Sequence, residues 1–385
     1  MSTLRVNTLQ NTSTTDGGIS IDTSGHVTVD GVVMPSSGPL SNRNKIINGD
    51  MRIDQRNAGA AVTVNSTANT YGVDRWFGSG QNTDGVFTID QTTDAPDGFT
   101  NSTRITVTTA DASIGATQNY LFRQAIEGNN VYDLDFGTAS AKTITFSFWV
   151  RSSLTGTFGG ALNNAANDRN YPFTYSISAA NTWEYKTVTV TGDTTGTWLT
   201  DTGRGITLTF QIGVGSSRVA TAGSWTGTSL VYGATGATNV IETLNATLDI
   251  TGVQLEVGSV ATPFEHRSYG DELARCQRYF QYFPAGAVGQ WNSSTVCELG
   301  ASYPVEMRTT PTASVNPNDA DCLIFRMGIS TNACTISSVT SNYLNKNGGV
   351  IGIVVSSTSS TPAFGDNAAY DPDGDSYVFF LSSEL

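Results

Sequence analysis

Few residues in this 385-residue chain belong to the types that perform acid–base or metal chemistry in enzymes. The chain has only two histidines, His26 and His266, which disfavours both a Ser-His-Asp arrangement and a histidine-rich metal site. The 33 acidic residues do not exclude a glycosidase, which needs only two carboxylates near a sugar. With no other catalytic pattern present, we expect a protein that is not an enzyme and that uses no cofactor.

The densest group of carboxylates lies near the C-terminus, where Asp366 is followed by Asp371, Asp373 and Asp375. A calcium loop of the EF-hand type needs glycine at its sixth position, whereas Gly374 falls at the fourth. A Pro-Asp-Gly sequence is typical of a tight turn. We predict a turn, with a cation site on Asp371, Asp373 and Asp375 as the alternative.

Aromatic side chains could bind a sugar, because the apolar C–H face of a pyranose stacks on an aromatic ring. Trp76, Trp149 and Trp183 fall in strand-like patterns and are expected to pack, as large aromatics usually do. Trp149 points away from Phe146 and Phe148, toward either a second core layer or a concave sheet surface. The predicted carbohydrate-binding residues are those in loop-like or C-terminal segments: Trp198, Trp225, Trp291, Tyr303 and Tyr343.

Composition narrows the possible partners. The net charge is −13 with a pI near 4.5, which disfavours nucleic acid, since phosphate binding needs clustered Lys and Arg. No stretch approaches the roughly 18 apolar residues of a membrane span, and the N-terminus has no apolar signal core. We expect synthesis in a cytoplasm and no membrane insertion. The four cysteines show no CxxC spacing and are predicted to be free, buried thiols.

The elements that must position these residues are predicted to be strands. Charged residues make up 14% of the chain against about 25% in a typical domain, and glycine contributes 40 positions. This composition, with its many Thr, Ser and Asn residues, favours an all-β protein. Residues 43–266 alternate apolar and polar side chains in many short runs, typical of a jelly-roll sandwich. The alternation slips at Gly252, which predicts a β-bulge.

Residues 1–42 are predicted to form strands too small to fold alone. Segments 18–22 and 26–30 alternate on either side of a turn, and a lone hairpin is only marginally stable in water. Their apolar faces therefore need a partner, most simply the same segment of sister chains. The residues expected in this seam are Leu4, Val6, Leu9, Ile19, Ile21, Val27 and Val29.

One helix is predicted within residues 267–284, capped by Asp271 and ended by Pro284. Its stripe of Tyr269, Leu273, Cys276, Phe280 and Phe283 follows an a/d spacing. The helix either lies on a sheet or forms a short seam between identical chains. The second possibility adds Leu273, Cys276 and Phe280 to the seam. Residues 285–385 are predicted to form a separate acidic β tip, a small β-sandwich.

Several segments resemble bacteriophage tail-fibre and receptor-binding proteins over residues 43–283. They are Asn48-Gly49-Asp50-Met51, Tyr71-Gly72-Val73-Asp74-Arg75-Trp76-Phe77, Phe146-Ser147-Phe148-Trp149-Val150-Arg151, Ile250-Thr251-Gly252-Val253-Gln254-Leu255-Glu256-Val257-Gly258, Thr262-Pro263-Phe264-Glu265 and Glu272-Leu273-Ala274-Arg275-Cys276-Gln277-Arg278-Tyr279. The opening Ser2-Thr3-Leu4-Arg5-Val6-Asn7-Thr8-Leu9-Gln10 resembles the attachment segments of virion proteins, particularly those of cyanophages.

The middle segments are also similar to jelly-roll carbohydrate-binding modules. These modules often carry a structural calcium near an Asn-Gly-Asp in the first strand and a paired Asp in the last. Asn48-Gly49-Asp50 is present here, but the paired position is Thr251-Gly252, which lacks the carboxylate oxygens that calcium needs. A calcium ion is therefore not expected in this domain.

The resemblance implies a homotrimeric tail fibre or receptor-binding protein of a phage virion. Residues 1–42 would dock on other virion proteins and intertwine with their copies, and the tip would bind a host-surface glycan through three weak sites acting together. A capsid-decorating or connector protein without receptor binding is the alternative. A polysaccharide-degrading tailspike is a further one, although such phage enzymes are usually long β-helices and no internal repeat of that kind occurs here.

Overall fold

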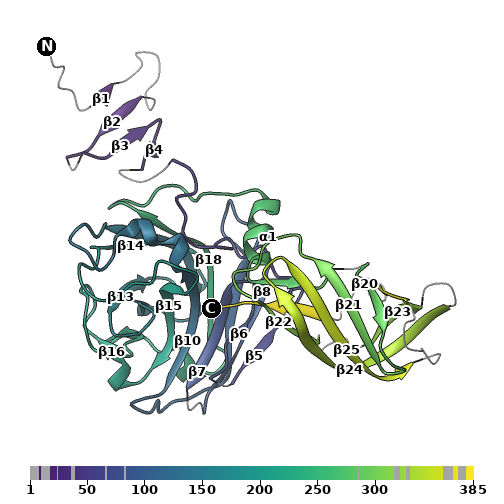
Figure 1. Ribbon diagram of the computed structural model, residues 1–385. Helices are drawn as coiled ribbons and strands as arrows, with labels where there is room; N and C mark the ends of the chain where they lie inside the picture. The colour runs from purple at the N-terminus through teal and green to yellow at the C-terminus, as the bar shows by residue number, and fades with distance from the viewer. Residues whose placement is uncertain are drawn as a thin grey trace, which may run out of the picture. The chain divides into compact units, whose positions relative to one another are not determined.

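The computed structural model describes residues 8–9, 18–23, 25–35, 40–65, 67–81, 84–284, 286–315, 321–326, 330–358, 367–371 and 379–385. The chain divides into two compact units, residues 1–267 and 268–384, with Leu385 grouped with the first. Nearly all of the regular structure is strand, as Figure 1 shows, so the all-β fold class is confirmed.

The N-terminal strands form a small antiparallel sheet in the order β1-β2-β3-β4. The strands are β1 (Thr8–Leu9), β2 (Ile19–Ile21), β3 (Val27–Val29) and β4 (Val32–Val33). Ile19 and Ile21 are 41% and 44% exposed, so this sheet leaves apolar side chains uncovered within one chain. Leu4 and Val6 lie outside the described residues. The seam between sister chains stays a prediction.

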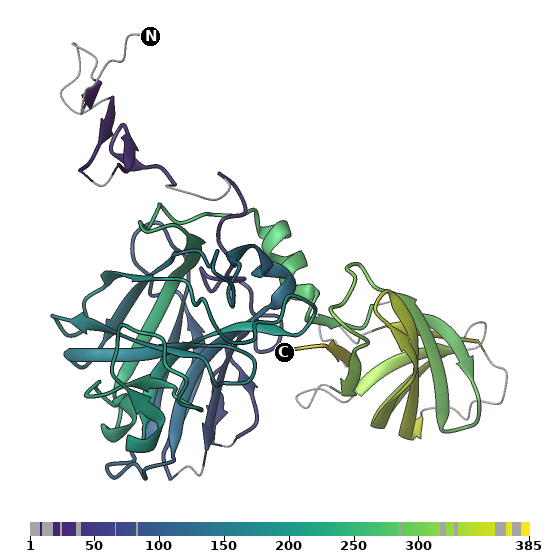
Figure 2. The ribbon, with the colours of Figure 1, turned by 60° about the vertical axis from the view of Figure 1, so that its left-hand side comes forward.

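Two six-stranded antiparallel sheets form the jelly-roll body of the first unit (Figures 1 and 2). The β10 sheet has the order β13-β12-β15-β10-β7-β6, and the β11 sheet has the order β14-β11-β18-β9-β8-β5. The strands of the β10 sheet are β6 (Thr70–Tyr71), β7 (Trp76–Gln81), β10 (Asn119–Glu127), β12 (Gly156–Asn163), β13 (Asn170–Ile177) and β15 (Arg204–Val214). Those of the β11 sheet are β5 (Val62–Val64), β8 (Val86–Thr92), β9 (Ser102–Thr109), β11 (Ile144–Ser152), β14 (Glu184–Val190) and β18 (Thr247–Val257).

Short elements connect these strands. β16 (Val219–Ala220) and β17 (Gly233–Ala234) pair in parallel, and their segment packs on the outer face of the β10 sheet, where Tyr232 joins Leu121 and Val214 in a small apolar cluster. The 3₁₀ turns are Gly128–Asn130, Tyr132–Leu134, Ser216–Arg218 and Val240–Glu242.

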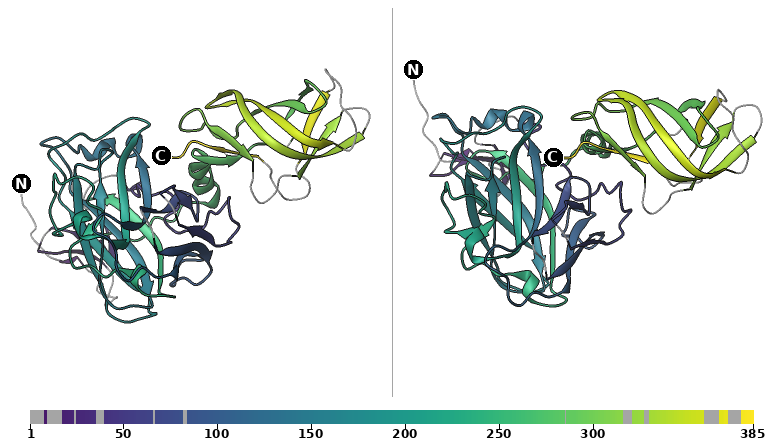
Figure 3. Two further views of the ribbon diagram at one scale, coloured as in Figure 1. Left: turned by 90° about the horizontal axis from the view of Figure 1, so that it is seen from below. Right: turned by 60° about the horizontal axis from the view of Figure 1, so that its bottom comes forward.

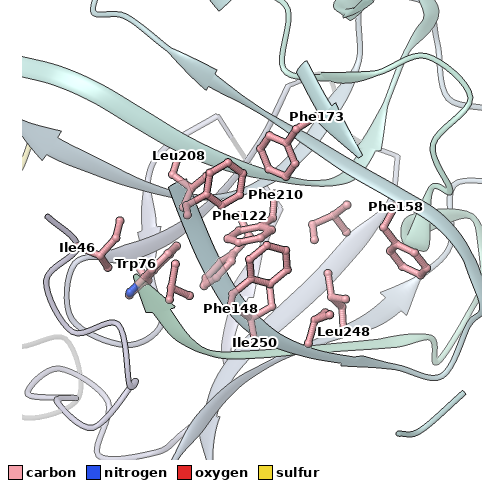
Figure 4. Packing of buried hydrophobic residues seen from close by; sticks show 14 of the residues in the cluster. Ile46, Trp76, Phe122, Phe148, Phe158, Phe173, Leu208, Phe210, Leu248 and Ile250 are labelled. Atoms are coloured by element: carbon pink, nitrogen blue, oxygen red, sulfur yellow. The ribbon is translucent and has the colours of Figure 1, made fainter. Parts of the chain in front are cut away.

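The core lies between the two sheets because alternate side chains of every strand point inward. Phe146 and Phe148 from β11 meet Phe173 and Phe210 from the β10 sheet, with ring centroids 4.7 Å apart for Phe146–Phe173 and 5.1 Å for Phe148–Phe210. Figure 4 shows Phe148, Phe173 and Phe210 among the aliphatic side chains of the cluster. Trp76 is fully buried and stacks on Phe122, so its predicted packing role is confirmed.

The Asn48-Gly49-Asp50 motif is a structural turn beside β18. The Asn48 Oδ1 accepts from the Ile53 amide at 2.9 Å, and its Nδ2 donates to the carbonyls of Ile53 and Asp74. A Cβ on Gly49 would lie 2.1 Å from the Val253 carbonyl oxygen, so only glycine lets the two backbones approach. Asp50 pairs with Arg52.

The bulge predicted at Gly252 is confirmed. The register between β11 and β18 shifts between Ser147 and Trp149, and Gly252 has a φ of 61°. The extra residue keeps both halves of β18 with their apolar side chains in the core, Ile250 before the bulge and Val253 and Leu255 after it.

The second unit contains a closed barrel with the strand order β20-β21-β25-β24-β23-β26, and a three-stranded sheet β19-β27-β22 (Figure 3). A barrel thus stands where a small two-layer sandwich was expected. The strands are β19 (Phe280–Tyr282), β20 (Val288–Trp291), β21 (Val296–Ser302), β22 (Thr312–Val315), β23 (Asp321–Arg326), β24 (Ser330–Asn345), β25 (Gly348–Thr358), β26 (Asn367–Asp371) and β27 (Phe379–Ser382).

The helix is shorter than predicted. α1 spans Tyr269–Gln277, and its N-cap is Ser268 rather than Asp271: the Ser268 hydroxyl accepts from the Asp271 amide at 3.2 Å. The a/d stripe does not continue, because Phe280 pairs in β19 with Ser382 of β27. Cys276 and Phe280 are buried in the chain's own fold and Leu273 is half-buried, so Cys276 and Phe280 have no surface to offer a seam.

Cys276 and Cys297 are free, buried thiols, as predicted. Cys322 and Cys334 are register partners on β23 and β24, but their side chains lie outside the described parts. Over the described residues, no helix is long and apolar enough to cross a membrane.

Candidate functional site

A pair of aromatic rings lies on the outer face of the β11 sheet. Because strand side chains alternate, Ser147 and Trp149 point away from the core that Phe146 and Phe148 fill. Trp149 is the register partner of Tyr185 on β14, and the two ring centroids are 5.4 Å apart at an interplanar angle of 50°. Trp149 is half-buried and Tyr185 is 43% exposed, so both rings are accessible from solvent.

A second group of rings faces the same space. Phe99 follows β8, and Phe264 and His266 lie in the segment after β18. The ring centroids are 5.1 Å apart for Phe99–Phe264, 5.4 Å for Phe99–His266 and 4.9 Å for Phe264–His266. The three rings therefore support one another, and the two contacts of Phe264 are edge-to-face, as aromatic groups prefer.

Two polar side chains of β18 hold the segment that carries Phe264. The Glu256 carboxylate accepts from the Thr262 amide at 2.8 Å and from the Thr262 hydroxyl at 2.7 Å. The Gln254 Oε1 accepts from the Glu265 amide at 2.8 Å. These buried hydrogen bonds hold residues 262–265 against the outer face of the sheet. The polar residues of the two sequence motifs, Gln-Leu-Glu and Thr-Pro-Phe-Glu, therefore bind each other.

The bulge at Gly252 lies between the two groups of rings. A Cβ at this position would lie 2.7 Å from the Phe99 Cζ and 3.1 Å from the Trp149 Cδ1. Two constraints therefore require glycine at this position. The backbone is left-handed, and the rings on either side leave no space for a Cβ.

Together these residues line a groove of about 640 Å³. Ser147, Thr262 and Asp97 add polar groups, and Val32 and Val33 complete the lining. The volume lies within the roughly 300–1,000 Å³ of small-molecule sites. Aromatic faces with a few hydrogen-bonding groups suit a ligand that has apolar C–H faces and hydroxyl edges, which is the chemistry of a sugar.

An ion-pair network stiffens the sheet beside the groove. The buried Asp249 accepts from Arg104 Nε at 2.8 Å and from Arg151 Nε at 2.8 Å. Asp94 bridges the same two arginines, and its hydrogen bond from Arg151 holds the pKa of Asp94 below its usual range. Arg151 also lies over the Trp183 ring, 5.2 Å from its centroid. Trp183 is thus fixed by packing, as predicted.

The predicted residues Trp198 and Trp225 form a different cluster. With Phe136 they make three edge-to-face contacts, with centroids 5.0 to 5.8 Å apart. Their indole N–H groups donate to the Thr195 and Thr191 carbonyls. Both tryptophans are half-buried against the jelly-roll core and neither lines the groove. Their role in binding stays a prediction.

The three aromatics predicted at the tip are not gathered on its surface. Trp291 is fully buried and Tyr303 is 8% exposed, both in the core of the second unit, so their assignment as surface contacts is corrected. A small barrel needs large side chains to fill its interior. Burial also raises the pKa of Tyr303 to about 12. Tyr343 is 74% exposed and is free to contact a ligand.

The aspartates considered as an alternative cation site lie at the edge of a described segment. Asp371 is the last residue of β26, while Asp373 and Asp375 lie outside the described residues. Within the described residues, no group of three His, Cys, Asp or Glu side chains is placed to hold a metal ion.

Sequence reasoning missed the groove. The outward direction of Trp149 was available from its position in β11, but two further facts were not. The first is that Tyr185, 36 positions later in the sequence, becomes the neighbour of Trp149 when β11 and β14 pair. The second is that Phe99 and Phe264 form the other side of the groove.

No protein-family model and no curated protein sequence matches the chain. Among solved structures, the enzymatically active domain of tailspike protein 4 of bacteriophage CBA120 is similar over 57% of this chain and 22% of that chain, with 12% identity and a TM-score of 0.30. The match thus spans about a fifth of that domain.

Two carbohydrate-binding modules are similar as well. A family 11 module of a cellulosomal cellulase of Clostridium thermocellum matches 50% of this chain and 97% of that chain, at 13% identity and a TM-score of 0.27. The module TmCBM61, solved with β-1,4-galactotriose, matches 56% and 99%, at 9% identity and a TM-score of 0.28. At these scores the jelly-roll assignment rests on the strand order of this chain itself.

Proposed function

We propose that this chain is a non-enzymatic glycan-binding protein, the tail fibre or receptor-binding protein of a phage virion, which attaches the particle to a host-surface glycan. The observation that carries the binding function is the groove on the β11 sheet, with the Trp149–Tyr185 ring pair on one side and Phe99 and Phe264 on the other. The virion role is supported by the resemblance of residues 43–283 to phage tail fibres.

The groove favours a neutral sugar. Its walls are aromatic, and among its described lining residues Asp97 carries the single carboxyl group and no Lys or Arg occurs. Ring faces stack on the C–H faces of a pyranose, while Asp97 offers a polar group to its hydroxyl edges. A pre-formed set of rings loses little side-chain entropy when a ligand binds.

The same lining favours binding over hydrolysis. A glycosidase needs two carboxyl groups about 5–9.5 Å apart across the scissile bond. Asp97 has no second carboxyl group beside it among the described residues that line the groove. A wild-type protein that releases reducing sugar from host polysaccharide would contradict the non-enzymatic function and favour a tailspike.

Attachment would come from several weak sites acting together. A shallow aromatic groove gives modest affinity, but linked copies raise the effective concentration of the second and third sites. The exposed Ile19 and Ile21 of the N-terminal sheet are the residues through which sister chains would associate.

The test is an array of bacterial surface glycans, including capsular polysaccharides and O-antigens, probed with three variants. Trp149→Ala and Tyr185→Ala should each weaken binding about tenfold or more, because each removes one stacking face. Tyr132→Ala is the matched control, since Tyr132 is 65% exposed and lies outside the groove; its binding should equal that of the wild type.

Two outcomes would contradict the proposal. If the wild type binds glycans and Trp149→Ala binds them equally well, the groove is not the site. If the wild type binds neither glycans nor host cells, a capsid-decorating or connector protein becomes the better explanation. Unfolding curves of all three variants should show a folded protein, because these rings lie outside the jelly-roll core.

A further inference from the structure

The outer face of the β10 sheet contains a second, smaller cavity. Its volume is about 230 Å³, and its lining residues are Thr67, Ser79, Gly80, Asn119, Arg123 and Tyr232. Ser79 and Gly80 come from β7, Asn119 and Arg123 from β10, and Tyr232 from the segment between β16 and β17. The cavity is therefore on the opposite sheet from the aromatic groove and shares no lining residue with it.

Arg123 is the charged group of this cavity. Its guanidinium lies between two rings, 5.1 Å from the centroid of Tyr232 and 6.0 Å from that of Phe77. Its Nη2 donates to the Ser79 hydroxyl at 2.8 Å. Its Nε has no hydrogen-bond partner among the described residues, and no described carboxylate pairs with it.

Two other arginines of the same unit are each completed by a carboxylate. Arg169 donates Nε and Nη2 to the two oxygens of Asp193, at 2.7 and 2.8 Å. Arg104 binds Asp249 in the same bidentate way, at 2.8 and 3.1 Å. Arg123 has the rings that hold the guanidinium in place but lacks the carboxylate, and a cavity lies beside it.

Arg123 is charged at neutral pH. Burial, opposed by Tyr232 and helped by the nearby cation of Arg204, lowers the pKa of Arg123 to about 10. A half-buried guanidinium whose Nε–H has no acceptor destabilises the fold unless an anion pairs with it. The chain's net charge is −13 and it has many carboxylates, yet among the described residues none lies at this guanidinium.

We propose that this cavity is a second ligand site, which takes a sugar residue bearing a carboxylate, with the carboxylate on the Arg123 guanidinium. The planar fork of arginine matches a carboxylate with two parallel hydrogen bonds. The volume is below the roughly 300 Å³ at which sites for drug-sized molecules begin, so it suits one sugar residue. Asn119 and Thr67 supply polar groups for the ring hydroxyls, and Tyr232 offers a ring face.

The test uses the full chain and galacturonate as the probe, titrated by ligand-observed NMR, with galactose as the neutral isostere. Galacturonate should bind in the millimolar range and galactose at least about tenfold more weakly, because only the first carries the carboxylate. Acetate and sulfate test whether the cavity binds any small anion or needs the sugar ring as well. If either binds as tightly as galacturonate, the cavity takes a bare anion and the sugar proposal is overturned.

Variants of the pocket complete the test. Arg123→Gln should lower galacturonate affinity about tenfold or more, while Arg218→Gln, on the covering segment but outside the cavity lining, should leave it unchanged. Equal losses in both variants would show general electrostatic attraction and overturn the site. Trp149→Ala should keep galacturonate binding, so a failure of the aromatic groove is distinguishable from a failure of this site.

A second variant tests the site even if Arg123→Gln does not fold. Ser79→Asp places a carboxylate where the Ser79 hydroxyl already meets Arg123 Nη2. It should raise the unfolding temperature by completing the ion pair, and it should abolish galacturonate binding by occupying the guanidinium. A Ser79→Asp protein that binds galacturonate as the wild type does would overturn the proposal.

Discussion

At the scale of single residues, Asp74 shows how the sequence motif around Trp76 builds a pH-dependent core. Asp74 is 1% exposed and accepts hydrogen bonds from the Gln55 amide, at 3.1 Å, and from the Gln55 side chain. Desolvation raises the pKa of Asp74 from 3.8 to about 6, against the opposing field of Arg56. The folded protein therefore takes up a proton at a pH where the unfolded chain has already lost it.

The sign of the resulting pH dependence follows from this raised pKa. The contribution of Asp74 to stability falls as pH rises from about 4 to about 6 and is constant above that range. Asp74→Asn keeps an acceptor for the Gln55 amide but cannot titrate. The free energy of unfolding of Asp74→Asn, relative to the wild type, should rise across this range by up to about 3 kcal/mol.

Urea unfolding at a series of pH values, followed by tryptophan fluorescence, measures this difference. Asp94→Asn is the control of opposite sign, because the hydrogen bond from Arg151 lowers the pKa of Asp94. Its destabilisation should be full at neutral pH and should vanish as pH falls through the pKa of the folded state. A flat Asp74→Asn difference between pH 4 and 6 would show that Asp74 ionises normally.

At the scale of elements, the bulge in β18 joins the fold to the groove. Gly252→Ala should destabilise the first unit by more than the ~1 kcal/mol of a left-handed alanine, since its Cβ also meets Phe99. Gly236→Ala is the matched control: Gly236 has a φ of 78° with no atom within 4 Å of the added Cβ. The free energy of unfolding of Gly236→Ala should fall only by the ~1 kcal/mol that a left-handed alanine backbone costs.

Glycan binding separates the two alanine variants further. Gly252→Ala should also weaken binding of whichever array glycan the wild type selects, because Phe99 or Trp149 must move. Gly236→Ala should bind like the wild type. If both variants lose the same stability and neither loses binding, the rings beside Gly252 do not define the groove.

At the scale of the whole molecule, the exposed apolar residues of the N-terminal sheet predict self-association. Light scattering on a size-exclusion column should give a mass near three chains for the full protein and near one chain after deletion of residues 1–40. Host-cell binding should fall by about a hundredfold or more on deletion, because the linked sites lose their effective concentration and the groove loses Val32 and Val33. A monomeric full-length protein would instead assign the N-terminal strands to a partner on another virion protein.

Several features could be predicted from local sequence alone. Alternation in 144–150 and 206–212 was enough to predict strands that bury Phe146, Phe148 and Phe210, because side-chain direction in a strand depends only on position. The slip at Gly252 predicted the bulge for the same reason. The free state of Cys276 and Cys297 followed from spacing and composition.

What local sequence could not decide was which surface each aromatic residue would meet. Trp291 and Tyr303 looked like recognition residues but fill a barrel, and Phe280 fitted a helical stripe but pairs in a strand. Trp149 was expected to pack but lines a groove with Tyr185, and Arg123 meets no carboxylate among the described residues. Local spacing determines the direction of a side chain, whereas its neighbours come from distant strands and loops that only the tertiary structure brings together.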